Sequence, residues 1–118
     1  MKLLNPYIFH QDQRGLFKGI TQDIWHEINY VETEAHLTRG NHYHKETLEL
    51  FYIISGEIDI QIRHLKSGAQ DTFLAKGGDI FVIEPYELHT FHTNTKAKWI
   101  NALSKAIDVE KPDIHKGP

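Results

Sequence analysis

The clearest hydrophobic pattern in the chain is a strict alternation of apolar and polar residues between positions 57 and 63. Ile58, Ile60 and Ile62 occupy every second position, and polar or charged residues fill the others. A period of two is typical of a β-strand with one buried face and one face in water. We therefore predict a half-solvated strand here, with its three isoleucines in the core.

The stretch before this strand, from Leu48 to Ile54, is apolar on both faces of an extended chain. A strand that is buried on both sides needs cover from outside its own sheet. A second copy of the chain is the simplest source of that cover, so a homodimer is expected.

Short apolar segments separated by turn residues fill the rest of the chain, without an amphipathic helix, a repeat or a long linker. Turns that contain glycine are expected at 66–69 and 76–79. Further strands are expected as two short pieces within 23–38 and at 71–75, 80–83, 88–93 and 98–103. Many short strands of this kind predict an all-β fold, an antiparallel sandwich or barrel formed by one domain over residues 1–118.

Composition and charge narrow the possible functions. The 118 residues include 13 basic and 16 acidic side chains, which gives a formal net charge of −3, and there is no basic run. A nucleic-acid partner is therefore not expected. The chain has no cysteine, which removes disulfides and thiolate chemistry and fits a reducing compartment. No segment has the apolar length of a membrane span or a secretion signal, so we expect a soluble cytoplasmic protein without a membrane partner.

The candidate chemistry lies around the start of the two-sided apolar stretch. His42 and His44 are two residues apart, so in an extended strand both imidazoles project from one face. Glu49 shares a face with Phe51, where an unpaired carboxylate would cost on the order of several kcal/mol. A shared metal ion would resolve that cost. The simpler alternative is two exposed loop histidines beside an ordinary surface glutamate.

A third histidine is placed by the same alternation. His89 and Phe91 share one face of the strand at 88–93, so His89 points inward if Phe91 does. Three imidazoles and one carboxylate suit a single divalent transition metal, Zn, Mn, Fe or Ni. His92 takes the opposite face, and its role stays open, since it could support the ligands only where the strand bulges.

These residues carry a resemblance to a known family. The spacing of Gly40, His42, His44, Glu49 and Gly56 resembles the first cupin motif in every interval. The segment from Gly78 to Ile83, followed by His89, resembles the second motif, although Glu84, Tyr86 and Thr93 replace its usual Pro, Gly and Asn. The resemblance implies a cupin jelly-roll barrel in which the metal ligands are His42, His44, Glu49 and His89.

Two further segments resemble cupins that act on nucleotide sugars. Asp12-Gln13-Arg14-Gly15 is similar to the Asp-x-Arg-Gly opening of the dTDP-sugar epimerases and ketoisomerases, although a plain turn also explains these residues. The septet from Thr38 to His44 and the segment from Asp108 to Asp113 resemble the C-terminal cupin domain of capsular polysaccharide enzymes that epimerise and reduce UDP-linked sugars. This similarity covers residues 12–115, without a reductase domain.

The resemblance implies a metal-dependent epimerase or isomerase that acts on a nucleotide-linked keto-sugar in polysaccharide biosynthesis. In the dTDP-sugar epimerases the base is the His of an Arg-Gly-x-His motif, which His42 matches. Because a metal-bound imidazole is a poor base, the proton would instead be moved by Glu49, Tyr86 or a bound water if a metal is present. A loop aromatic that covers the barrel mouth is the simpler interpretation of Tyr86.

Three residues near the metal motif are candidates for substrate binding: Arg39, Asn41 and Lys45. Arg39 could clamp a pyrophosphate, or it could pair with Glu32 or Glu34. Few cations are available for a diphosphate. The alternative function is therefore a small metal-binding cupin of other specificity, either a ligand-binding module or a metal-dependent oxygenase.

Overall fold

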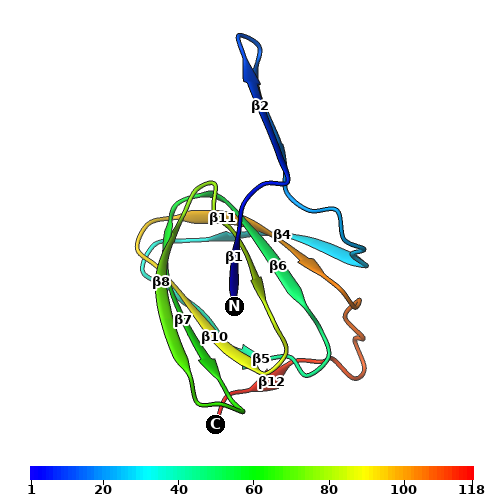
Figure 1. The fold of residues 1–118 in the computed structure, drawn as a ribbon. Coiled ribbons are helices and arrows are strands. Elements are labelled where there is room, and N and C mark those ends of the chain that lie inside the picture. The colour runs from blue at the N-terminus through cyan, green and yellow to red at the C-terminus, as the bar shows by residue number, and fades with distance from the viewer.

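The computed structural model describes residues 1–118 and contains only strands, turns and loops (Figure 1). The strands are β1 (Lys2–Leu4), β2 (Ile8–Asp12), β3 (Gly15–Gly19), β4 (Glu27–Thr33), β5 (Thr38–Tyr43), β6 (Glu49–Ser55), β7 (Glu57–His64), β8 (Gln70–Lys76), β9 (Ile80–Ile83), β10 (Glu87–Thr93), β11 (Ala97–Leu103) and β12 (His115–Lys116). No helix in the chain has the length and apolar character that crossing a bilayer requires.

Two five-stranded antiparallel sheets pack face to face. The first sheet has the order β1-β9-β6-β11-β4 and the second has the order β12-β5-β10-β7-β8. The core between them includes the three alternating residues Ile58, Ile60 and Ile62, all buried as the period of two predicts. The expected all-β antiparallel sandwich is thus confirmed, and β9 occupies the predicted residues 80–83.

The prediction of two strands between residues 23 and 38 is wrong. Only β4 lies within this range, and the next strand, β5, begins at Thr38. The segment before β4 does not pair with a strand because its apolar side chains are used differently. Ile20 and Trp25 pack on the outer face of the first sheet, against the cluster formed by Leu50, Ile80 and Ala102.

The same segment covers part of the outer face of β6. Leu50 on the outer face is only 3% exposed, and its cover comes from Ile20 and Trp25 of the same chain. Ile54, at the other end of the strand, is 41% exposed. Cover from the chain itself therefore accounts for part of the two-sided apolar pattern, and the end of β6 at Ile54 is left without it.

A β-bulge aligns the two strands of the second sheet that carry histidines. The register between β5 and β10 shifts between His89 and Thr90, so that His42 lies opposite His89. Gly40 makes the bulge possible, because its φ is +102° and an added Cβ would lie 2.6 Å from the carbonyl oxygen of His89.

The β2–β3 hairpin projects away from both sheets (Figure 1), and the molecule measures 50 Å along its longest axis against 32 and 28 Å along the others. Its turn is the Asp-x-Arg-Gly segment, as the sequence predicts. Asp12 accepts hydrogen bonds from the backbone N–H of Arg14 at 2.9 Å and from its guanidinium at 2.6 Å. Gly15 takes a φ of +130°.

Candidate metal centre

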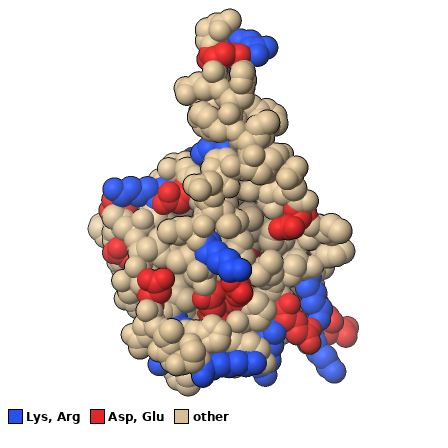
Figure 2. All heavy atoms as spheres, viewed as in Figure 1, with Lys and Arg blue, Asp and Glu red and all other residues tan.

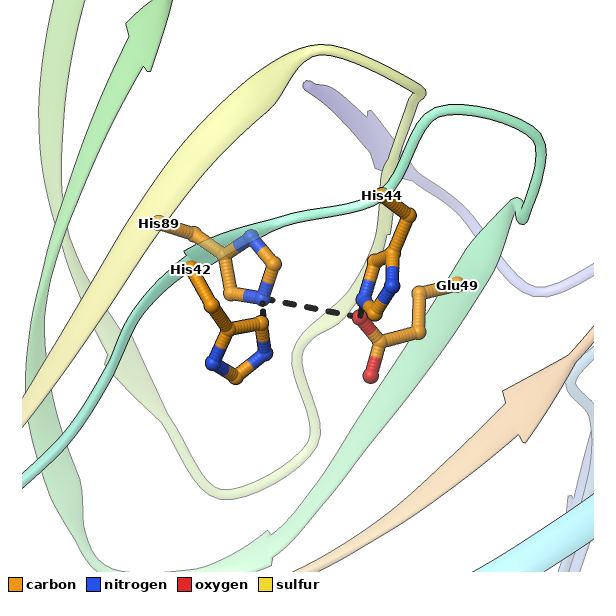
Figure 3. Close-up of side chains that lie close together, drawn as sticks. All are labelled: His42, His44, Glu49 and His89. Atoms are coloured by element: carbon orange, nitrogen blue, oxygen red, sulfur yellow. Dashed lines mark hydrogen bonds and ion pairs between the residues drawn. The ribbon is translucent and has the colours of Figure 1, made fainter. Parts of the chain in front are cut away.

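Four side chains converge inside one end of the sandwich (Figure 3). His42 comes from β5, His44 directly follows that strand, Glu49 begins β6 and His89 lies in β10. One nitrogen or oxygen atom of each lies within 4.8 Å of those of the other three. The structure therefore brings together the four residues that the sequence proposes as metal ligands.

The distances within this cluster suit a single ion. Glu49 Oε1 lies 2.8 Å from His44 Nε2 and 3.5 Å from His89 Nε2. The Nε2 atoms of His89 and His42 are 3.1 Å apart. Ligand atoms about 2.0–2.2 Å from one metal ion lie roughly 3 Å or a little more from each other. These three distances thus match the spacing of donor atoms around one ion.

Hydrogen bonds on the far side of two rings decide which nitrogen faces the centre. His44 Nδ1 lies 2.5 Å from the carbonyl oxygen of Asp113, and His89 Nδ1 lies 3.0 Å from that of Glu87. A carbonyl only accepts, so each Nδ1 carries hydrogen, and each neutral ring turns the lone pair of Nε2 inward. His44 Nε2 and the Glu49 carboxylate then face each other as two acceptors, which only a proton or a metal cation can join.

The pKa shifts favour the deprotonated, metal-binding forms of His42, His89 and Glu49, whereas at His44 a proton competes with a metal ion. Burial lowers the pKa of His89 to about 4 and also lowers that of His42, in spite of the nearby carboxylate. Burial acts in the same direction on His44, but the hydrogen bond and charge of Glu49 outweigh it and raise the pKa of His44. Burial opposes ionisation of Glu49, yet its contacts with His44 and His89 leave the pKa of this carboxyl lowered.

The cluster is reached from two cavities. One of about 140 Å³ has an apolar wall made by Val31, Phe51, Phe91 and Trp99. The other, of about 220 Å³, lies beside residues 105–107 and 113–114. His42, Glu49 and Asn101 line both cavities, so a small molecule in either one would contact the cluster.

Arg39 lies at the first cavity and makes no ion pair with a carboxylate. Its Nε donates to the Thr33 hydroxyl at 2.7 Å, and its Nη2 reaches the backbone carbonyl of Glu32 at 3.3 Å. The alternative pairing with the side chain of Glu32 or Glu34 is wrong, because both carboxylates lie within 3.7 Å of Lys96 Nζ instead. The charge of Arg39 is thus available to an anionic ligand.

The other three expected site residues lie outside these cavities. The ring of Tyr86 stacks on that of Tyr43, with centroids 6.0 Å apart, beyond the side of β5 that carries the cluster. Asn41 lines a groove on the outer face of the second sheet. Lys45 has an exposed side chain, and its backbone N–H donates to Asp113 at 2.9 Å.

The remaining histidines are not part of the cluster. His92 is exposed on the outer face of β10, and its Nδ1 lies 2.9 Å from the Thr38 hydroxyl. His10 lies 3.4 Å from a carboxylate oxygen of Asp12. The only group in the chain with metal-ligand spacing is the one formed by the four predicted ligands.

Comparison with known proteins places the chain in a family. The family described as "Polysaccharide biosynthesis C-terminal domain" matches residues 10–113, which is most of the chain. The chain belongs to this family. The resemblance to the cupin domain of capsular polysaccharide enzymes is therefore confirmed. None of the curated proteins compared with the domain matches it significantly.

Solved structures confirm the cupin jelly-roll fold of the polysaccharide biosynthesis domain. The capsular polysaccharide assembling protein CapF from Staphylococcus aureus has 23% identity and a TM-score of 0.73, over 98% of this chain and 34% of CapF. The rmlC epimerase of Mycobacterium tuberculosis has 16% identity and a TM-score of 0.78, over 92% of this chain and 65% of the epimerase. The sugar 3,4-ketoisomerase QdtA from Thermoanaerobacterium thermosaccharolyticum has 16% identity and a TM-score of 0.79, over 96% of this chain and 85% of QdtA. The domain thus spans about a third of the length of CapF.

Asn101 also belongs to the site, although it was not among the residues predicted from the sequence. Its Nδ2 donates to Glu49 Oε2 at 2.7 Å, while its Oδ1 is buried without a hydrogen-bond partner. The sequence pattern could have indicated Asn101. It follows Trp99 at a spacing of two, so it is a polar residue on the buried face of the predicted strand at 98–103.

Asp113 was also missed as a structural support of the site. Its carboxylate accepts hydrogen bonds from the backbone N–H groups of Lys45, Glu46 and Thr47 at 2.9, 2.8 and 3.0 Å. Burial opposes its ionisation, but these hydrogen bonds hold the pKa of Asp113 well below its usual range. Its carbonyl meanwhile orients His44 across a separation of 69 residues, which no local pattern in the domain's sequence reveals.

Proposed function

We propose that this domain is a metal-binding epimerase or isomerase that acts on a nucleotide-linked keto-sugar in polysaccharide biosynthesis. The buried cluster of His42, His44, Glu49 and His89 beside two cavities carries the proposal. The related structures support the choice of substrate class. They include an epimerase in complex with dTDP-4-keto-L-rhamnose and a ketoisomerase in complex with TDP.

The chain offers the groups that such a reaction needs. Removing the proton next to a ketone requires a base, an acid and positive charge close to the developing oxyanion. A divalent ion held by the four ligands would supply that charge when bound. Arg39, which makes no ion pair with a carboxylate, is available for a phosphate group at the mouth of the first cavity.

Two residues are candidates for moving the proton. His42 is only partly buried and lines both cavities, and because burial lowers its pKa, the neutral ring that can accept a proton dominates at neutral pH. As a metal ligand His42 would lose this role. Glu49 is the other ionisable side chain that lines both cavities. It is also a proposed ligand, so it could move the proton only through the carboxylate oxygen that does not bind the metal, and Asn101 donates to its Oε2.

The proposal includes a homodimer and a cytoplasmic location. The exposed end of β6 at Ile54 supports the need for some additional cover. The absence of cysteine fits a reducing compartment.

Metal analysis of the purified protein tests the first part of the proposal. We expect about one transition-metal ion per chain in the wild type, and its loss in His44→Ala and Glu49→Ala, because each variant removes one of four ligands. His92→Ala is the matched control, since this histidine is exposed and does not contact the cluster. An absence of metal after reloading would contradict the ligand assignment and return His42 to the role of a free base.

Solvent exchange tests the reaction. A nucleotide keto-sugar incubated with the protein in deuterated water should take up deuterium next to the ketone, and Glu49→Gln should abolish this uptake. A protein that holds its metal but exchanges no proton with any nucleotide keto-sugar would favour the alternative, a metal-binding cupin of other specificity.

A further inference from the structure

A groove on the outer face of the second sheet is separate from the metal cluster, and we call it the outer groove. It crosses β5, β10, β7 and β8. Its volume is about 350 Å³, larger than either cavity beside the cluster and within the range of small-ligand sites. None of the four metal-ligand candidates lines it. A molecule in the outer groove would therefore not contact the cluster.

The alternation that buries the isoleucines of β7 directs the polar residues between them into the outer groove. Ile62 is 4% exposed in the core, so Gln61 and Arg63 project from the opposite face. Their partners in the neighbouring strands also line the groove: Thr90 and Leu88 in β10, and Thr72 and Gln70 in β8. These rows of side chains cross three strand spacings, or roughly 14 Å, which is long enough for a short oligosaccharide.

The bulge between β5 and β10 adds Asn41 to the groove. Asn41 directly follows Gly40 and has a φ of +58°, a left-handed conformation that asparagine adopts more readily than most residues. A bulge re-aims the side chain that it carries. Here the amide of Asn41 lies on the outer side of β5, away from the cavities that His42 lines.

The polar side chains of the outer groove make no hydrogen bond within the chain. This is true of three amides, those of Asn41, Gln61 and Gln70, and of the hydroxyls of Thr72 and Thr90. Amides and hydroxyls both donate and accept hydrogen bonds. The groove thus presents a set of free donors and acceptors whose positions are fixed by one sheet.

Arg63 is the only arginine of the chain without a hydrogen bond or an ion pair. Arg14 and Arg39 both have partners. Arg63 is half-buried and lies opposite Leu88, which is only 9% exposed. Its planar guanidinium carries five N–H donors in a fixed geometry. The groove therefore includes one strong, directed donor group that the fold itself does not use.

The lining indicates the kind of ligand. Its only hydrophobic members, Ile62 and Leu88, are both buried, so an apolar ligand does not fit. Its one cation, Arg63, is balanced by one carboxylate, Asp71, whereas a phosphate-rich ligand favours several cations. Figure 2 shows basic and acidic side chains scattered in small groups over one face of the molecule, with much uncharged surface between them. A neutral molecule with many hydroxyl groups matches this lining.

We propose that the outer groove binds a neutral saccharide chain through hydrogen bonds to its hydroxyl groups. Arg63 donates to hydroxyl oxygens, and the amides of Gln61 and Asn41 donate and accept. This site is distinct from the one assigned to a nucleotide-linked keto-sugar, and it requires neither the metal nor catalysis.

NMR titration of the wild-type protein tests the proposal. The probes are neutral hexasaccharides of glucose, galactose, mannose and N-acetylglucosamine. We expect at least one of them to shift the side-chain amide signals of Asn41, Gln61 and Gln70 and to leave that of Asn101, at the metal cluster, unchanged. No shift with any hexasaccharide would overturn the proposal, and so would shifts at Asn101 alone. Shifts at the groove with inorganic pyrophosphate, but with no saccharide, would overturn it in favour of an anion site.

Matched variants test the assigned contacts. Arg63→Ala should weaken binding of the most tightly bound hexasaccharide about 10-fold or more, and Gln61→Ala about 3- to 10-fold. Asp59→Ala is the control and should bind like the wild type, because Asp59 projects from the same face of β7 but does not line the groove. Circular dichroism and metal content verify that these variants are folded. Unchanged binding in both groove variants would contradict the proposal.

One further variant separates this inference from the proposed function. His44→Ala removes a metal ligand on the inner side of the sandwich, so it should lose the metal and still bind the saccharide. Loss of saccharide binding together with the metal would place the saccharide at the cluster and overturn the proposal.

Discussion

His89 is only 2% exposed, and its environment decides how acid affects the protein. One ring nitrogen is held by the carbonyl of Glu87, and the other faces His42 and Glu49. Burial disfavours the charged ring and lowers the pKa of His89 to about 4 from its ordinary 6.5. In the unfolded chain this histidine would take up a proton at a much higher pH.

The metal-free protein should therefore lose stability as the pH falls from about 6.5 toward 4. In this range the unfolded state binds a proton at residue 89 that the native state does not, so the free energy of unfolding should decrease, by up to about 3 kcal/mol. His42, whose pKa is also lowered, acts in the same direction, while the raised pKa of His44 opposes it.

Urea unfolding in the presence of a chelator, at several pH values, measures this effect. His89→Gln should reduce the pH dependence, whereas His92→Gln, on the exposed face of β10, should retain it. Equal pH dependence in the wild type and in His89→Gln would show that His89 is not the group responsible.

Asn101 supports the site through a single hydrogen bond. Asn101→Ala leaves Glu49 Oε2 without its donor at 2.7 Å, so we expect a loss of about 1–3 kcal/mol of stability and about 10- to 100-fold weaker metal binding. Asn94→Ala is a matched control, because this residue donates to Glu57 at 3.2 Å, far from the ligands. Competition with a chelator measures the affinity, and unchanged binding in Asn101→Ala would count against the assigned role.

At the scale of elements, β5 and the segment that contains Asp113 act together. β5 carries His42, ends directly before His44 and lies between β10 and β12, with His115 opposite Tyr43. The carboxylate of Asp113, just before β12, accepts hydrogen bonds from the backbone of the loop between His44 and Glu49 and so holds this loop in place. The geometry of two ligands thus depends on a segment that is distant in sequence.

We therefore expect Asp113→Ala to weaken metal binding about 10-fold or more. The loop loses its hydrogen bonds to the carboxylate, and the backbone carbonyl that orients His44, although still present, is no longer held in place. Asp108→Ala removes similar bonds to the backbone N–H groups of Glu110 and Lys111, but outside the site. Calorimetric titration with a divalent ion should separate the two variants. If both bind metal like the wild type, Asp113 has only a local structural role.

The strands were predictable where burial follows a simple alternation. The three isoleucines of β7 and the pair His89 and Phe91 of β10 lie on the expected faces. The prediction failed before β4 because Ile20 and Trp25 are apolar for a different reason. They cover the outer face of a sheet that is formed by residues far away in the chain, and a local pattern does not distinguish such cover from a strand.

For the whole molecule, the sequence predicted the cluster of His42, His44, Glu49 and His89 better than its surroundings. The spacing of His42, His44 and Glu49 is local in the sequence, and strand alternation alone puts the two histidines on one face and Glu49 on the face of Phe51. The positions of Tyr86 and Arg39 relative to the cavities depend on how separate strands meet. Arg39 donates to a hydroxyl and a carbonyl, whereas the alternative from the sequence was a carboxylate of Glu32 or Glu34. The positions of residues that strand alternation does not fix can be determined only from the tertiary structure.

The spread of the cluster along the chain also affects how fast the protein folds. His42 and His89 are 47 residues apart, and Asp113 is 69 residues from His44, so the site is complete only after distant strands have met. Folds dominated by such contacts reach the native state in milliseconds to seconds. A divalent ion that requires all four ligands would bind after the rate-limiting step.

Such an ion should slow unfolding and leave the refolding rate almost unchanged. Stopped-flow measurements with and without metal would detect this difference, and faster refolding with metal would mean that His42, His44 and Glu49 already hold the ion early. If refolding is unchanged and unfolding is slower, the separation of the ligands makes the bound ion a kinetic barrier to unfolding that plays no part in folding.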